Sequence, residues 1–189
     1  GHLTAYTIKQ TSPHFDGVPD ITVVNQFGTT AVDLYRPERL LVPTSKSLTS
    51  PPGPLTEALD HFKCYRVRGA RFRRKGVTVE TQFGPATVDI KQPRHLCAPA
   101  DKNDEDPGAE THALHLMCYQ VRARPQQPRG VFTLNQFGPD AYDIFGLRDE
   151  PQHRHMIRLL CRTQVRATHD RVARRMHGFV RRSVPRQRH

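Results

Sequence analysis

Polar side chains that could bind a ligand recur three times along the chain at one spacing. Each copy places a glutamine directly before a Phe-Gly pair and an aspartate seven residues after that glutamine. The six residues are Gln26, Asp33, Gln82, Asp89, Gln136 and Asp143. Amide and carboxylate groups hydrogen-bond sugar hydroxyls, so one hypothesis is a set of three related carbohydrate sites. The interpretation we favour is structural, because such side chains also satisfy backbone N–H groups where hairpins end.

The four cysteines follow the same repetition. The second and third copies hold two each, namely Cys64 and Cys97, and Cys118 and Cys161. The first copy has Ala5 and Leu41 at the matching positions, so both cysteines are absent together, as the partners of a disulfide would be. We therefore predict the disulfides Cys64–Cys97 and Cys118–Cys161, one of three connectivities, and an oxidising compartment. No two cysteines are closer than 21 residues, whereas zinc sites and redox motifs need close pairs.

The acidic stretch over 101–113 offers another set of ligand atoms. Asp101, Asn103 and Glu105 place side-chain oxygens at alternate positions, as calcium-binding loops do. The stretch lacks the sixth-position glycine and the distal glutamate of such a loop, because Pro107 follows directly. We therefore favour a solvated acidic linker and keep calcium as the alternative. No other cofactor is expected.

Positive charge is concentrated at the C-terminal end. The formal net charge is +11, and residues 151–189 account for +10 of it with eleven arginines and one acid. After Thr168, a suitable N-cap, residues 169–182 are predicted to form a basic amphipathic helix. Such a helix binds a partner protein or lies on an anionic membrane surface or polysaccharide; the alternative is that it covers the β body with its apolar face inward. The predicted partner-binding residues are Arg171, Arg174, Arg175, Met176, Phe179, Arg181 and Arg182.

A second basic run extends from Arg66 to Lys75 and holds six cations in ten residues. It lies between two predicted strands. In one interpretation it grips a polyanion, and in the other it is a solvated loop.

The recurring residues belong to three copies of one unit, at 1–45, 60–100 and 114–163, the last with an insertion. A Pro-rich linker (46–59) and the acidic linker (101–113) join them, and an Arg-rich extension covers 164–189. Alternation of apolar and polar residues predicts about four short β-strands per copy, around 61–68, 77–83, 86–91 and 94–98 in the second. The expected fold is all-β, either β-trefoil-like or tandem small β-modules, with a C-terminal basic helix. Closure is slightly favoured, because a unit of about 40 residues buries too little surface alone.

The recurring pattern is His-x-x-Cys-Tyr-x-Val, then Asn-Gln-Phe-Gly, then Val-Asp-Ile-x-x-Pro-x-x-Leu-Cys-x-Pro. It resembles repeat modules of uncharacterised exported bacterial proteins. The resemblance covers residues 2–145, although the first copy lacks the cysteines and the third carries the insertion. It implies β structure and export to the periplasm, cell surface or medium, and it adds no chemistry.

No catalytic constellation stands out in the sequence. It contains no Gly-x-Ser-x-Gly, P-loop, His-Glu-x-x-His or dinucleotide-binding glycine motif, and no apolar run of the roughly 20 residues that a membrane helix needs. We expect a non-enzymatic exported binding or assembly subunit of a larger protein complex or cell-surface structure, docking partly through the Arg-rich extension. The alternative is a carbohydrate-binding module with up to three related sites. Nucleic acid is not an expected partner, because residues 1–150 are nearly neutral.

Overall fold

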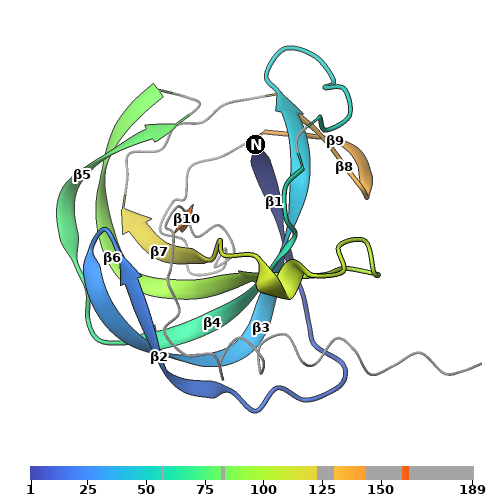
Figure 1. The fold of residues 1–189 in the computed structure, drawn as a ribbon. Coiled ribbons are helices and arrows are strands. Elements are labelled where there is room, and N and C mark those ends of the chain that lie inside the picture. Colours follow the sequence, from blue (N-terminus) through green and yellow to red (C-terminus); the bar gives the residue numbers. More distant parts are fainter. Residues whose placement is uncertain (57, 82–83, 123–129, 144–158, 162–189) are drawn as a thin grey trace, which may run out of the picture.

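A computed structural model describes residues 1–56, 58–81, 84–122, 130–143 and 159–161. These residues form ten β-strands, all in antiparallel pairs, and one short 3-10 helix, which confirms the expected all-β class (Figure 1). The elements are β1 (His2–Thr7), β2 (Val18–Asn25), β3 (Gly28–Ser47), β4 (Phe62–Gly69), β5 (Arg74–Thr81), β6 (Gly84–Pro99), η1 (Ala109–Thr111), β7 (Leu116–Arg122), β8 (Val131–Asn135), β9 (Gly138–Tyr142) and β10 (Leu159–Cys161). Within the described ranges, no helix is long and apolar enough to cross a membrane.

The first unit consists of three strands where four were expected. Strands β2 and β3 form a hairpin that turns between Asn25 and Gly28, and the 20-residue β3 then continues until it pairs along β1. The second unit repeats this plan with β4, β5 and the 16-residue β6. The expectation of four short strands is wrong for these two units, because the third and fourth strands form one continuous strand.

Both long strands change register at a proline. The pairing of β3 with β4 shifts on either side of Pro37, and that of β6 with β7 shifts on either side of Pro93. Proline has no N–H to donate, and it is tolerated inside a sheet at such bulges. A bulge bends the strand without ending it. The prolines therefore mark bends in β3 and β6, and the strands continue through them.

The units share one sheet. Strand β3 pairs with β4 of the second unit, β6 pairs with β7 of the third, and the end of β3 pairs with β8. The path runs β10-β7-β6-β4-β3-β8-β9, and among the described strands its two ends do not pair with each other. The described sheet is therefore open and is not a closed trefoil. The units are not independent tandem modules either, because each long strand takes backbone hydrogen bonds from more than one unit.

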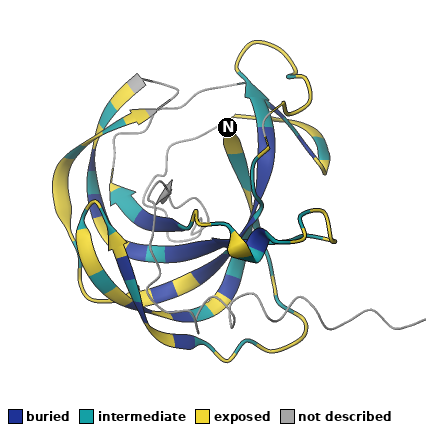
Figure 2. Ribbon diagram, viewed as in Figure 1, coloured by how far each residue is buried: buried dark blue, intermediate teal, exposed yellow. Residues whose placement is uncertain are grey.

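Two groups of buried side chains form the core. The larger one joins the β2–β3 hairpin to the central strands β4, β6 and β7, along which Figure 2 shows buried residues. Ile90 and Met117 in this group are completely buried. The smaller one packs Leu41, Phe62 and Leu116 around the cysteines. Burial of this apolar surface holds the curved strands together and fixes which side chains point outward.

The cysteines link neighbouring strands. Cys64 and Cys97 lie opposite each other on β4 and β6 and form the predicted disulfide, with an S–S distance of 2.03 Å. Cys118 is also disulfide-bonded, and its Sγ lies 3.8 Å from that of Cys97. The backbone of Cys161 lies opposite Cys118 in the β7–β10 pairing, which is the register that the predicted second disulfide needs. The side chain of Cys161 and the predicted helix at 169–182 lie outside the described residues.

Replacing the disulfide by the residues of the first unit should cost stability. The variant C64A/C97L introduces the residue types found at Ala5 and Leu41 and opens a loop with a sequence separation of 33. We expect the free energy of unfolding to fall by about 3–4 kcal/mol in urea denaturation. Thiol titration should still find no free cysteine, since Cys118 stays bonded. A loss below about 1 kcal/mol would show that the disulfide is dispensable for the fold.

Candidate functional site

The recurring aspartates bind the backbone. Oδ1 of Asp33, Asp89 and Asp143 each accepts a hydrogen bond from a backbone N–H thirteen residues earlier, at 2.9, 3.1 and 2.8 Å. The donors are Asp20, Gly76 and Gly130, whose φ angles lie between 55° and 66°. Such left-handed residues interrupt the regular ladder, so their N–H groups need an acceptor from elsewhere. This geometry supports the structural interpretation of the three aspartates.

The recurring glutamines lie apart from these aspartates. Gln26 and Gln136 are exposed at hairpin tips, and Oε1 of Gln136 lies 3.1 Å from Nε2 of His61. Asp33 follows the turn residue Gly28 by five positions along β3, which is about 16 Å in a strand. Gln82 lies outside the described residues. The structure therefore does not bring Gln26 and Asp33 into one sugar site.

Asparagines at two hairpin tips connect units that are distant in sequence. Nδ2 of Asn25 donates to the hydroxyl of Tyr119 at 2.7 Å, and Nδ2 of Asn135 donates to the hydroxyl of Tyr6 at 2.9 Å. The tip phenylalanines pack edge-on against the same tyrosines, with ring centroids 5.4 and 4.9 Å apart. Sequence reasoning missed these contacts because the partners are 94 and 129 residues apart. They fix the hairpins onto the sheet.

The acidic linker uses its predicted calcium ligands internally. Oδ1 of Asp101 accepts the backbone N–H of Asp106 at 3.1 Å, and Glu105 forms an ion pair with Lys102. Asn103 has a φ of 58°, in the turn between them. These contacts favour the solvated linker over a calcium loop.

A different group, formed by the acidic linker and the start of the second unit, brings three ligand atoms together. Nδ1 of His112 lies 2.9 Å from Oδ1 of Asp60 and 3.7 Å from Oδ2 of Asp106, and the three ligand atoms lie within 4.8 Å of one another. A nitrogen and two carboxylates could hold a divalent cation. The hydrogen bond between Asp60 and His112 already accounts for the arrangement, because it ties the acidic linker to the start of the second unit.

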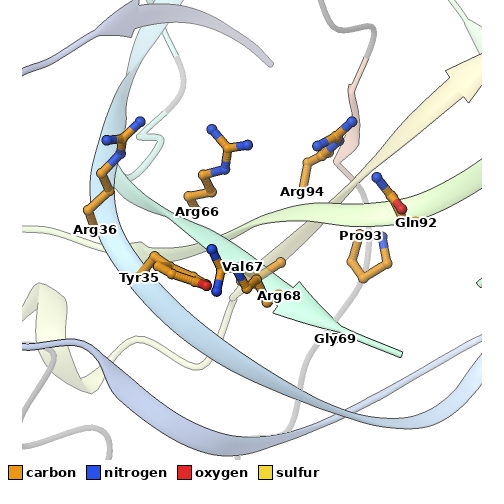
Figure 3. A pocket seen from close by; sticks show the side chains of 9 residues that line it. All are labelled: Tyr35, Arg36, Arg66, Val67, Arg68, Gly69, Gln92, Pro93 and Arg94. Carbon is orange, nitrogen blue, oxygen red and sulfur yellow. The ribbon is translucent and has the colours of Figure 1, made fainter. Parts of the chain in front are cut away.

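A polar cleft opens where β4 is flanked by the bends of β3 and β6. Its volume is about 550 Å³, and four arginines line it. Figure 3 shows Arg36, Arg66 and Arg94 in a row, with their guanidinium groups pointing to the same side. The lining residues are Tyr35, Arg36, Arg66, Val67, Arg68, Gly69, Gln92, Pro93 and Arg94. We call this site the arginine cleft.

Two of its arginines face each other directly. Arg36 and Arg66 are register partners between β3 and β4, and like charges opposed in this way destabilise a sheet. Glu38 offsets part of this cost, because its Oε1 lies 3.4 Å from a guanidinium nitrogen of each arginine. Its Oε2 accepts a hydrogen bond of 2.7 Å from Nε2 of His95, whose side chain is 1% exposed.

Burial and hydrogen bonding set the charge of this pair. Burial holds the pKa of His95 below its ordinary value, although its bond with Glu38 acts in the opposite direction. Burial acts to raise the pKa of Glu38, but the hydrogen bond from His95 and the charge of Arg66 outweigh it and leave that pKa lowered. At pH 7 the imidazole is therefore neutral and donates to an ionised carboxylate. The cleft then carries four guanidinium groups against one carboxylate.

The other two arginines are held by their own contacts. The guanidinium of Arg68 lies 3.8 Å over the ring of Tyr35, and Nη2 of Arg94 donates to Oε1 of Gln120 at 2.9 Å. Nε of Arg94 is buried and has no hydrogen-bond partner among the described groups. Burial and the charge of Arg66 lower the pKa of Arg94. Guanidinium groups that such contacts already hold in place suit an oxyanion, because carboxylate, sulfate and phosphate each accept paired N–H hydrogen bonds.

Sequence reasoning found half of this cleft. Arg66 and Arg68 lie in the basic run for which a polyanion was one interpretation. Arg36 and Arg94 come from other strands and were missed, because only the bends of β3 and β6 bring them beside β4. The partner-binding residues predicted in the tail lie outside the described residues, namely Arg171, Arg174, Arg175, Met176, Phe179, Arg181 and Arg182.

The aspartates should matter for stability. Asp89→Ala removes the acceptor for the N–H of Gly76, so we expect the free energy of unfolding to fall by about 1 kcal/mol. The exposed Asp16 provides the control Asp16→Ala, which should leave it unchanged. Chemical denaturation measures both. A variant of Asp89 with unaltered stability but weakened binding to a neutral glycan would support the sugar-site hypothesis instead.

Acidification should weaken the fold through His95. Its pKa in the folded protein lies below the unfolded value of about 6.5. The unfolded chain therefore takes up this proton first, and the stability present above that pH is lost as the pH falls towards the folded pKa. In His95→Gln the unfolding free energy should decline less between pH 7 and pH 5 than it does in the unmodified protein. The control variant His14→Gln, at an exposed residue, should show the same decline as the unmodified protein. Equal declines in both variants would contradict this assignment.

A family model matches residues 2–144, and its description is a repeat of unknown function (DUF7450). No curated protein and no solved structure is significantly similar to the chain. The matched segment begins at β1 and ends just after β9, so it contains the whole arginine cleft. The chain therefore belongs to this family of repeats.

Proposed function

We propose that the chain is an exported, non-enzymatic binding or assembly subunit that holds an anionic partner in the arginine cleft. The observation that carries the proposal is the direct opposition of Arg36 and Arg66 in a cleft also lined by Arg68 and Arg94. Opposed like charges cost stability, and the carboxylate of Glu38 offsets only part of that cost. A bound anion supplies the missing negative charge.

The chemistry of the cleft favours binding over catalysis. Guanidinium groups donate hydrogen bonds and remain protonated, so they hold an anion without exchanging protons with it. The one imidazole beside them, His95, is buried and already bonded to Glu38. A general base must reach a substrate proton, and this imidazole faces the protein instead.

Export and a second docking segment complete the proposal. The disulfide between Cys64 and Cys97 supports export, because disulfides persist in oxidising compartments. The Arg-rich extension at 164–189 supplies further positive charge for an anionic surface or partner protein. Three sugar sites at the Gln–Asp pairs receive less support, because the aspartate carboxylates accept backbone hydrogen bonds.

Removing two cleft charges should weaken anion binding. We expect R66A/R68A to bind labelled dextran sulfate at least about tenfold more weakly, because each lost charge-assisted hydrogen bond is worth about 1.5–3 kcal/mol. Its affinity should also depend less steeply on salt. The matched control R71A/R73A removes two exposed charges of the same run outside the arginine cleft. Fluorescence anisotropy over a salt series measures both, and equal losses in the two variants would contradict the proposal.

A further inference from the structure

The row of arginines crosses neighbouring strands. Arg36, Arg66 and Arg94 come from β3, β4 and β6, and β4 lies between the other two in the sheet. Neighbouring strands are about 4.8 Å apart, so the backbone positions from which these arginines extend are spaced at intervals comparable to one sugar ring. Figure 3 shows the three side chains side by side in this order. A linear ligand with an anion on successive units could therefore lie across the strands.

The arginine cleft offers no free aromatic face. Tyr35 is the aromatic residue among its lining residues, and the guanidinium of Arg68 covers that ring at 3.8 Å. Proteins that bind single-stranded nucleic acid combine a basic groove with aromatic rings on which bases stack. This cleft has the charge without the stacking surface, which disfavours a nucleic acid.

Glu38 does not line the cleft itself, but its carboxylate lies beside two lining residues, Arg36 and Arg66, and adds an acceptor there. Its side chain is 22% exposed, and the bond from His95 fixes its position. A carboxylate at this place accepts a hydrogen bond from a hydroxyl, and a polyuronate carries hydroxyls on every unit. The exposed amide of Gln92 offers a further donor and acceptor. The mixture of cations and hydroxyl-binding groups matches a polymer that carries both a carboxylate and hydroxyls on each unit.

We infer that the arginine cleft binds a linear acidic polysaccharide of the uronate class, lying across β3, β4 and β6. The inference rests on the proposed function and names its ligand. Arg36, Arg66, Arg68 and Arg94 bind the carboxylates, and Glu38 selects for hydroxyl groups between them. Acidic polysaccharides occur on cell surfaces and in the medium, where an exported protein would meet them.

Binding of oligogalacturonate tests the inference. The full-length protein, R66A/R68A and the control R71A/R73A are titrated with labelled oligogalacturonate, dextran sulfate, oligo-dT of matched charge and neutral dextran. We expect R66A/R68A to lose at least about tenfold in affinity for oligogalacturonate and the control to keep it. Oligo-dT should bind all three proteins equally through charges outside the cleft. Glu38→Gln should narrow the preference for oligogalacturonate over dextran sulfate.

The titrations with the four ligands distinguish the uronate inference from the broader proposal that the cleft binds an anion. If R66A/R68A loses affinity for dextran sulfate but keeps its affinity for oligogalacturonate, the uronate inference is wrong and the anion-binding function still stands. Tighter, cleft-dependent binding of oligo-dT overturns it in favour of a nucleic acid. If R66A/R68A binds oligogalacturonate and dextran sulfate as tightly as the unmodified protein does, both proposals are wrong. Arg36→Gln repeats the test at a side chain that is 66% exposed, where the substitution leaves the core untouched.

Discussion

The structure depends on backbone pairing that is shared between units. Strand β3 forms hydrogen bonds with β1 and β2 of its own unit, with β4 of the second and with β8 of the third. Strand β6 does the same for β4, β5 and β7. Neither strand could keep these partners if it ended at its proline, so the bulges at Pro37 and Pro93 are what allow one sheet to form. The core and the disulfide between Cys64 and Cys97 then stabilise an arrangement that the long strands have already set.

Residues that recur between the units support the scaffold, and residues that differ form the arginine cleft. The three aspartates repeat one backbone contact, and Asn25 and Asn135 repeat another with a distant tyrosine. By contrast, Arg36 occupies the position that Gln92 has in the second unit, and Glu38 the position of Arg94. Two neighbouring copies of one strand thus supply different side chains to the two walls of a single cleft. A repeated scaffold gains a specific site in this way, because the surface can vary while the pairing is retained.

Much of the fold could be predicted from local patterns, and much of the site could not. Period-two alternation indicated the strands, and the joint absence of cysteines at Ala5 and Leu41 indicated the bond between Cys64 and Cys97. The continuity of β3 and β6 was not predicted, because a proline in a sequence usually indicates the end of a strand. Only the register of the neighbouring strands shows that β3 and β6 continue. The other half of the cleft was missed for the same reason, since the bulges decide that Arg36 and Arg94 lie beside Arg66. Contacts such as Asn135 with Tyr6 join residues 129 positions apart and leave no local signal.

The proposed function requires the arginines of the cleft to hold the anionic ligand, whatever charge the C-terminal extension adds. The Nε–Hε signals of arginine side chains in an NMR spectrum test it most directly, because each guanidinium reports its own hydrogen bonding during a titration with oligogalacturonate. We expect saturable shifts for Arg66 and Arg68, whose side chains line the cleft. Shifts confined to arginines after position 151, with the cleft signals unmoved at saturation, would contradict the proposed function.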